Sequence, residues 1–328
     1  MDPSDEPLNP ERLDTLVKPK RFSFKKFAII LIAAFAITAV AYGASTVGRL
    51  SKIIVKNTGR GAPLLRGGGI QGEGDGRINV LILGMGGPGH PGGLLADIIM
   101  VLSVDPVNHK AAFLTVPRDL AVDYPKPLTG GGKINNVHAY GEERKKEVPG
   151  GGPALMKQTV SDILDLPIHY FVRVDFKAFE KLVDTVGGVT INVEKPLYDP
   201  LYPAPNMIDY EPFSIAAGVQ NLDGKIALKY ARSRETTSDF DRSRRQVQIL
   251  LALKEKVLKL NILGNPRKVN EIATTLGDHL RTDFSVKEFE RFFGIVTQIN
   301  EKPIVKVLDS SESGPLVSRS GENGAYLL

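Results

Sequence analysis

The chain of 328 residues contains no cysteine. Disulfide bonds, cysteine-ligated zinc and thiol catalysis are therefore excluded. No internal repeat is visible, which leaves a folded protein of one or two ordinary domains. Lysine and arginine outnumber aspartate and glutamate by 42 to 37, so the net charge is +5. This basic balance indicates an anionic partner such as nucleic acid, lipid headgroups or phosphate esters.

Charged residues are also absent from residues 27–48. At about 1.5 Å per residue, this apolar run is long enough to cross a hydrocarbon core of roughly 30 Å. A buried core helix rarely extends so far without a polar face. A cleaved signal peptide is the other alternative, because residues 39–41 (AVA) resemble a cleavage site. We predict an uncleaved single-pass anchor. Basic residues flank it on both sides, so the charge distribution favours a cytoplasmic N-terminus only slightly.

Five regions are predicted along the chain. They are a cytoplasmic tail at 1–26, the anchor at 27–48, a glycine-rich linker at 49–77, the catalytic domain at 78–310 and a C-terminal tail at 311–328.

The domain opens with three strand-like runs rich in aliphatic and β-branched residues, at 78–83, 98–104 and 111–116. The link between the second and third runs is too short for a helical crossover, and the glycines and prolines of residues 84–97 argue against a helix there. We therefore predict a meander of three antiparallel strands. Its topology brings residues 84–86, Asp97 and Arg118 to the same edge of the sheet.

Later segments alternate between helical and strand-like patterns. We expect helices at 153–164, after the N-cap Asp175, at 242–260 and around 266–280, strands at 169–174 and 189–193, a lid-like loop at 196–212, and a last pair of short elements at 286–300 and 304–308. The predicted fold class is α/β, with a mixed, partly antiparallel central sheet flanked by helices and one N-terminal transmembrane helix.

Residues 84–89 fit the pattern G-x-G-x-x-G, which occurs in dinucleotide-binding sites. Such a site needs a helix directly after the glycines, so that backbone N–H groups meet the pyrophosphate. Pro88 and Pro91 prevent that helix here. We expect the glycines to let the loop fold closely over the sheet edge or over a ligand instead.

Five arginines are concentrated in one short segment: Arg232, Arg234, Arg242, Arg244 and Arg245. A solvated basic face is the usual explanation of such a cluster. On a helical wheel, however, Arg242 and Gln246 continue the apolar stripe of the following helix. Arg245 borders that stripe and Arg244 lies outside it. Guanidinium groups in a cleft suit phosphate, because their planar fork makes two charge-assisted hydrogen bonds.

Two structural alternatives stay open at this point. The arginines could form ion pairs with Asp239 or Asp241 instead of binding a ligand. At the sheet edge, Arg118 could extend the anion site. Asp97 could supply a hard oxygen ligand for Mg²⁺, or it could pair with Arg118.

Taken together, these segments resemble the LytR-CpsA-Psr family of cell-wall ligases. The resemblance is carried by INVLILG (78–84), ADIIMVLSVD (96–105), AAFLTVPRDL (111–120), KINNVHAYG (133–141), GGPALMKQTVSDILDLPIHYFVRVDFKAFEKLVDTVGGVTINV (151–193) and AAGVQNLDGKIALKYARSRETTSDFDRSRRQVQIL (216–250). The order and spacing of the motifs hold across all of these stretches.

The resemblance implies a single-span membrane protein with its catalytic domain outside the cytoplasm. It implies a phosphotransferase that moves a glycan phosphate from a polyprenyl-pyrophosphate carrier to a hydroxyl of peptidoglycan or another wall acceptor. Mg²⁺ on the diphosphate would be bound by Asp97. The pyrophosphate would be contacted by Arg118, Arg232, Arg234, Arg242 and Gln246, and Arg245 is added because it borders the same stripe. Catalytic roles fall on Asp97, Arg118, Arg234 and Arg242.

Two positions depart from the family pattern. Leu95 stands where an arginine is usual, and Gly86 stands where a second aspartate is usual. The leading alternative is therefore a non-catalytic module that binds polyprenyl phosphate or pyrophosphate, although His90 or loop carbonyls could replace the missing carboxylate. A nucleic-acid-binding regulator is disfavoured, because the chain lacks a DNA-reading helix pair and its domain follows a membrane span.

Overall fold

The computed structural model of the chain describes residues 69–204, 209–233, 239–260, 276–277, 279–299, 301–309, 315–317, 319–320 and 326–327. The predicted tail at 1–26, the anchor at 27–48 and most of the predicted linker lie outside the described residues, as do Arg234 and residues 266–275. Within the described ranges, no helix is both long and apolar enough to cross a membrane.

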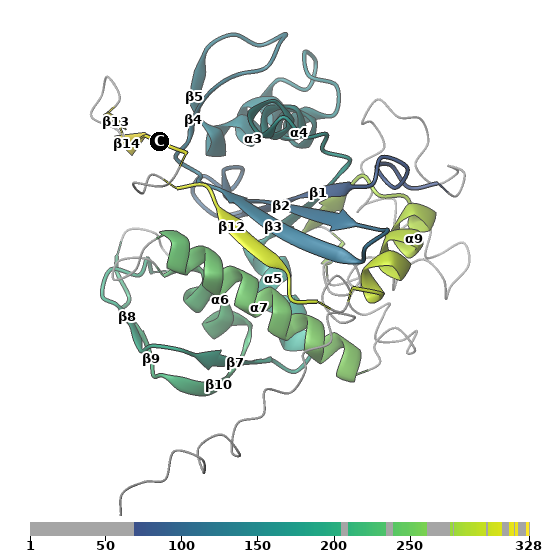
Figure 1. Cartoon of the computed structure of the whole chain (residues 1–328). Coiled ribbons are helices and arrows are strands. Elements are labelled where there is room, and N and C mark those ends of the chain that lie inside the picture. Colours follow the sequence, from purple (N-terminus) through teal and green to yellow (C-terminus); the bar gives the residue numbers. More distant parts are fainter. Residues whose placement is uncertain are drawn as a thin grey trace, which may run out of the picture.

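A six-stranded mixed sheet forms the centre of the molecule (Figure 1). Its strands lie in the order β11 (Leu280–Thr282), β6 (Tyr170–Asp175), β1 (Ile78–Met85), β2 (Ala96–Asp105), β3 (Lys110–Val116) and β12 (Ile304–Val307). The strands β1, β2 and β3 are antiparallel neighbours. By contrast, β6 pairs with β1 and β12 pairs with β3 in parallel, and β11 is antiparallel to β6. The predicted meander and the predicted mixed sheet are confirmed.

Helices cover both faces of this sheet (Figure 1). The helices α3 (Ile134–Glu143) and α4 (Gly151–Leu164) lie over one face. The other face carries α5 (Phe176–Thr185), α6 (Gly224–Arg232), α7 (Asp239–Lys259) and α9 (Val286–Thr297). Within β1, Leu81 and Leu83 belong to the core on the side of α3 and α4, whereas Val80 and Ile82 belong to the core on the opposite face. A strand covered on both faces needs apolar side chains on both sides, which explains the aliphatic run at 80–83 within β1.

Four two-stranded sheets surround this core in the described part of the chain. They pair β4 (Ala121–Asp123) with β5 (Gly131–Lys133), β7 (Val189–Val193) with β10 (Gly218–Leu222), β8 (Leu197–Asp199) with β9 (Phe213–Ile215), and β13 (Arg319–Ser320) with β14 (Tyr326–Leu327).

Side-chain caps fix the starts of three helices. The carboxylate of Asp175 accepts a hydrogen bond from the Ala178 N–H at 2.8 Å, as predicted for the N-cap of α5. Asp223 caps α6 in the same way, and Ser285 forms a capping box with Glu288 at the start of α9. Such caps satisfy N–H groups that a helix leaves unpaired.

Three predicted boundaries are wrong. The folded chain begins before residue 78, because Ile70 is buried in the core and the Gln71 N–H donates to the Tyr170 hydroxyl at 2.9 Å. The predicted loop at 196–212 contains the strand β8, and Leu280 of the predicted helix 266–280 belongs to β11. Strands of three residues carry too little periodicity to be recognised in a sequence.

Neither α3 nor α6 is among the expected helices. The α3 segment contains two asparagines, a histidine and a glycine, which all have low helix propensity. Its stability comes from close packing on α4, because a Cβ atom on Gly141 would lie only 2.8 Å from the Gly152 Cα. Tertiary contact therefore forms this helix against its local preference.

His138 on α3 should make the fold sensitive to acid. Its side chain is fully buried, and burial, reinforced by the charge of Arg173, lowers its pKa from 6.5 to about 4. The unfolded chain therefore binds the extra proton between these two values. The free energy of unfolding should fall by about 2 kcal/mol from pH 7 to pH 5 through this residue alone. Urea unfolding at both pH values measures the loss, and His138→Gln should flatten the pH dependence even if it lowers stability overall. An unchanged slope in that variant would contradict the assignment.

Candidate active site

A cavity of about 460 Å³ lies between the sheet and helices α5, α6 and α7. Sites for small ligands usually have volumes of about 300–1,000 Å³. Most of its lining is apolar and comes from Ile82, Met100, Val174, Phe179, Leu182, Ile249, Leu250, Leu253, Leu276 and Leu280. Polar side chains in the lining are His90, Asp97, Arg118, Asp175, Asp199, Arg232, Arg242 and Gln246. Apolar volume and convergent charged groups in one cavity suit an amphipathic ligand with an anionic headgroup.

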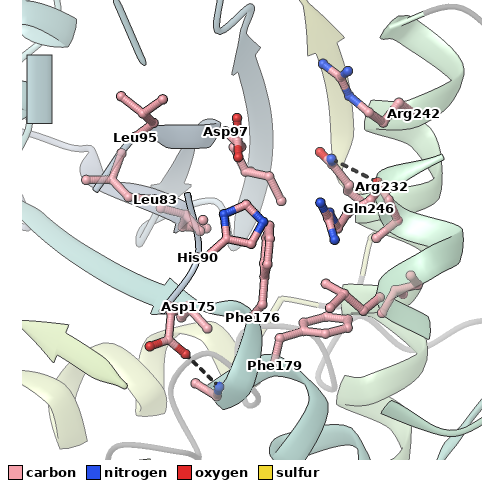
Figure 2. Close-up of a pocket in the computed structure, with 18 of the residues that line it drawn as sticks. Leu83, His90, Leu95, Asp97, Asp175, Phe176, Phe179, Arg232, Arg242 and Gln246 are labelled. Carbon is pink, nitrogen blue, oxygen red and sulfur yellow. Dashed lines mark hydrogen bonds between the residues drawn. The ribbon is translucent and has the colours of Figure 1, made fainter. Parts of the chain in front are cut away.

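The charged groups face one another across this cavity. Figure 2 shows His90 and Asp97 on the side of the β1–β2 loop, opposite Arg232, Arg242 and Gln246 on the helices, with Phe176 and Phe179 below. Residues of the sheet edge and of the arginine segment therefore line the same cavity. Their functional roles remain predictions.

The helical register of α7 explains why Arg242 and Gln246 reach the cavity. Both lie on the face that continues with Ile249, Leu250 and Leu253, and all five side chains line the cavity. The Gln246 side-chain amide donates to the Ala231 carbonyl at 3.3 Å. This contact joins α7 to the end of α6, so that the two helices present their polar groups together.

Arg232 is held at the C-terminal end of α6. Its guanidinium donates to the Tyr202 hydroxyl at 3.1 Å and lies 4.3 Å from the centroid of the Phe176 ring. Burial raises the pKa of Tyr202, and the positive charge of Arg232 partly opposes that rise. The hydroxyl therefore stays protonated at neutral pH. A guanidinium stacked on an aromatic ring has few conformations to lose when it binds an anion.

Arg118 and Asp97 form the ion pair that the sequence left open. The Arg118 guanidinium donates to Asp97 Oδ1 at 2.6 Å, and both side chains are 28% exposed. On its other side, Arg118 Nε lies 3.6 Å from Asp119, which also pairs with Lys133 at 2.5 Å. The start of α3 braces this turn, because the Asn135 N–H donates to the Arg118 carbonyl at 3.2 Å.

Arg244 and Arg245 are not among the lining residues. Arg244 is on the exposed side of α7, where it pairs with Glu194 at 3.1 Å. Arg245 is buried and donates to the Tyr230 carbonyl at 3.0 Å and to the Ser233 carbonyl. Burial lowers the pKa of the Arg245 guanidinium. The structure therefore does not bring Arg245 to the predicted anion site, because its donors close the end of α6 instead.

The glycine loop between β1 and β2 contains no helix, as predicted from its prolines. It folds back on itself through hydrogen bonds from the Gly87 N–H to the Gly93 carbonyl and from the Gly93 N–H to the His90 carbonyl. Gly87 has a φ of 82°, and a Cβ atom there would lie 2.6 Å from the Asp175 side chain. Only glycine combines this conformation with so close an approach to the sheet edge.

The donor set does not fit a magnesium site built from protein groups alone. Among the described residues, no group of three or more His, Cys, Asp or Glu side chains could hold a metal ion. Asp97 already accepts from Arg118 through Oδ1. Asp175 accepts from Ala178 and lies 2.6 Å from His279 Nδ1. A cation near Asp97 would need most of its oxygen ligands from a bound ligand or from water.

Several lining residues were not recognisable as site residues in the sequence. Phe176, Asp199 and Leu201 come from segments without a motif of functional chemistry. His90 carries the clearest signal, since an imidazole stands in a loop of glycines and prolines that bounds the sheet edge.

Sequence comparison places the chain among proteins of one family. It matches the LytR_cpsA_psr family over residues 45–318. The chain is 31% identical to TagU of Oceanobacillus iheyensis over 65% of its own length. TagU is named a polyisoprenyl-teichoic acid–peptidoglycan teichoic acid transferase. The aligned stretch spans only 61% of the length of TagU. TagT of Bacillus subtilis, which bears the same transferase name, is 26% identical over 86% of this chain and 85% of its own length.

Solved structures of related proteins share the fold. TagT bound to LIIa-WTA superposes with a TM-score of 0.57 at 26% identity and covers 78% of this chain and 85% of its own. TagV of B. subtilis superposes with a TM-score of 0.56 at 25% identity over 76% of this chain and 89% of its own.

Proposed function

This chain belongs to the LytR-CpsA-Psr family, and from that membership we propose that it transfers a glycan phosphate from a polyprenyl-pyrophosphate carrier to a hydroxyl of a cell-wall acceptor. The observation that carries this proposal is a cavity in which an apolar interior meets Arg118, Arg232 and Arg242. A polyprenyl chain needs the apolar interior, and a diphosphate needs the guanidinium groups. The teichoic acid transferase names of TagU and TagT agree with a wall glycopolymer as the transferred group.

The proposed reaction is a substitution at phosphorus. An acceptor hydroxyl attacks the sugar-proximal phosphorus, the new O–P bond forms, and the bond to polyprenyl phosphate breaks with its electron pair on the leaving group. Arg232 and Arg242 would neutralise charge on the diphosphate from the helix side, and Arg118 would do so from the sheet side. Positioning and charge stabilisation account for most of the catalysis in such reactions.

Asp97 would act on Arg118 in this scheme. The 2.6 Å ion pair fixes the direction of the guanidinium at the cavity wall. Mg²⁺ bound to the substrate diphosphate would supply further positive charge, with Asp97 as its protein ligand. The protein donors among the described residues do not form a cation site of their own.

The proposed location is the outer side of the cell membrane. The apolar run at 27–48 would serve as a single-pass anchor with a cytoplasmic N-terminus, and the domain would meet its lipid carrier at the membrane surface. Peptidoglycan or another wall polymer would be the acceptor. No nucleic acid is required by the proposed reaction.

Release of polyprenyl phosphate tests the proposed function directly. The full chain is incubated with a synthetic polyprenyl-pyrophosphate glycan and an acceptor glycan, and released polyprenyl phosphate is measured by mass spectrometry with Mg²⁺ present or chelated. We expect release that depends on the acceptor and that Mg²⁺ raises without being indispensable. Tight lipid binding without any release would support the alternative, a polyprenyl-pyrophosphate-binding module. That alternative is favoured by Leu95 and Gly86, which remove a cation and a carboxylate from the site.

A further inference from the structure

We propose that His90 is the group that takes the proton from the acceptor hydroxyl. The inference rests on the proposed function and assigns one residue of the same site. His90 stands in the loop between β1 and β2 and lines the cavity beside Asp97. Figure 2 shows its ring projecting from that loop toward Arg232 and Gln246.

The imidazole occupies the space above Gly86. A Cβ atom added to Gly86 would lie 2.4 Å from His90 Nδ1 and 2.6 Å from Cγ, so any larger side chain at 86 would displace the ring. The ring also meets Phe176 edge-on, with 5.2 Å between the centroids and an interplanar angle of 88°. The glycine and the histidine are therefore coupled: the missing side chain at 86 makes room for the imidazole in the cavity wall.

A hydrogen bond to the backbone fixes the tautomer of His90. Nδ1 lies 2.7 Å from the Pro91 carbonyl oxygen. A carbonyl oxygen can only accept, so Nδ1 must carry the hydrogen and the neutral ring has its lone pair on Nε2. The Nε2 atom is enclosed and has no hydrogen-bond partner among the described residues. An enclosed acceptor without a donor is costly, and an incoming hydroxyl would supply that donor.

The carboxylates of the cavity are already engaged. Asp97 accepts from Arg118, and Asp175 accepts from Ala178 and contacts His279. Asp199 accepts from the Leu201 N–H at 3.2 Å. The charged groups that share the cavity with His90 are Asp97 on β2, Arg118 after β3, Asp175 at the end of β6, Asp199 on β8, Arg232 on α6 and Arg242 on α7.

The proton-transfer step is balanced without any further reactant. The O–H bond of the acceptor breaks as its oxygen bonds to phosphorus, and the proton moves to His90 Nε2 to form an imidazolium. The bond from phosphorus to polyprenyl phosphate breaks, and the leaving group takes its electron pair. The imidazolium then gives its proton to the departing phosphate or to solvent, which restores the neutral ring. General bases contribute about 10²–10⁴-fold to such rates.

His90→Asn is the decisive variant, because the asparagine amide can still donate to the Pro91 carbonyl while the acceptor at Nε2 is lost. His109→Asn is the matched control, since His109 stands at the β2–β3 turn with a φ of 53°, a conformation that asparagine tolerates. The full chain is assayed for polyprenyl phosphate release from the synthetic lipid across a range of pH. Binding of the lipid and the thermal midpoint are measured for each protein.

We expect His90→Asn to lower kcat at least about 100-fold while lipid affinity and thermal midpoint stay close to those of the wild type. The wild-type rate should fall toward acidic pH, because protonation of Nε2 removes the acceptor, and the residual rate of the variant should not. Added imidazole should restore part of the rate in His90→Ala. His109→Asn should behave as wild type.

Two results would overturn the inference in distinguishable ways. An active wild type with an equally active His90→Asn refutes the role of His90 and leaves the proposed function standing. A wild type that binds the lipid but releases no polyprenyl phosphate refutes both. A His90→Asn variant that loses lipid affinity as strongly as rate would show a ligand-binding role in place of proton transfer.

Discussion

Replacing Asp283 with alanine should lower the free energy of unfolding by about 3–5 kcal/mol, as expected when one partner of a buried ion pair is removed. The Asp283 side chain is 1% exposed and its partner Lys157 is 13% exposed. Lys157 Nζ donates to Asp283 at 2.8 Å, and the Phe171 N–H of β6 donates to the other carboxylate oxygen at 2.8 Å. Alanine would leave a charged amine and a backbone N–H without this acceptor in the interior.

Urea unfolding of the variant, followed by circular dichroism, measures the loss. Asp283→Asn should be intermediate, because an amide oxygen can still accept from Phe171 but carries no charge for Lys157. Arg291→Ala is the control, since the Arg291–Glu73 pair is on the surface and 58% of the arginine side chain is exposed. Its unfolding midpoint should match that of the wild type. Equal midpoints for the Asp283 and Arg291 variants would show that the buried pair contributes nothing particular.

The central strands could be predicted because their local pattern and their tertiary role agree. Buried strands covered by helices on both faces are rich in aliphatic and β-branched residues, and so are 78–83, 98–104 and 111–116. The short link between the second and third runs, and the glycines and prolines between the first and second, then indicated antiparallel neighbours. By contrast, β12 pairs with β3, from which it is separated by most of the domain's sequence. No feature of residues 304–307 indicates β3 as the partner.

The ion pair of Lys157 and Asp283 could not have been predicted from the sequence. The two residues are 126 positions apart. Neither stands in a charged cluster or at a helical spacing from the other. Their pairing follows from the packing of α4 on β6 and from the pairing of β11, which directly precedes Asp283, with the same strand. Both are properties of the tertiary fold.

Part of the candidate site could be predicted from the sequence, because helical periodicity indicates which side chains of α7 share one face. Arg242 and Gln246 were placed correctly because the apolar stripe of α7 fixes the direction of every side chain on that helix. Arg245 sits at the margin of the stripe, where periodicity leaves the direction open. Carbonyl groups at the end of α6 draw it away from the cavity.

The two departures from the family pattern take on a physical meaning in the structure. Gly86 leaves the space that His90 fills. Leu95 lines the cavity and contacts the glycine loop, since a Cβ atom on Gly92 would lie 2.8 Å from its Cδ1. An apolar contact thus lies on the wall at the position where an arginine is usual in the family. At both positions, a neighbouring group packs against the residue that differs from the family pattern. A comparison of motifs alone does not reveal these contacts.

Replacing Arg242 with alanine should weaken binding of a polyprenyl-pyrophosphate lipid by about 1.5–3 kcal/mol, which corresponds to roughly 10–150-fold in Kd. Arg242 lines the cavity, whereas Arg244, two positions along the same helix, pairs with Glu194 on the exposed side. An exposed ion pair of this kind contributes little to stability. Arg244→Ala therefore removes the same charge from the same helix without touching the cavity.

Titration of the purified full chain with a fluorescent polyprenyl-pyrophosphate measures both affinities. The difference between the two variants should be at least about 1.5 kcal/mol and should shrink little in high salt, because a contact inside a cavity is screened less than a surface charge. Arg242→Lys should recover only part of the loss, since an ammonium lacks the fork that holds two phosphate oxygens. Equal losses for Arg242→Ala and Arg244→Ala would mean that net positive charge, and not the cavity face of α7, holds the diphosphate.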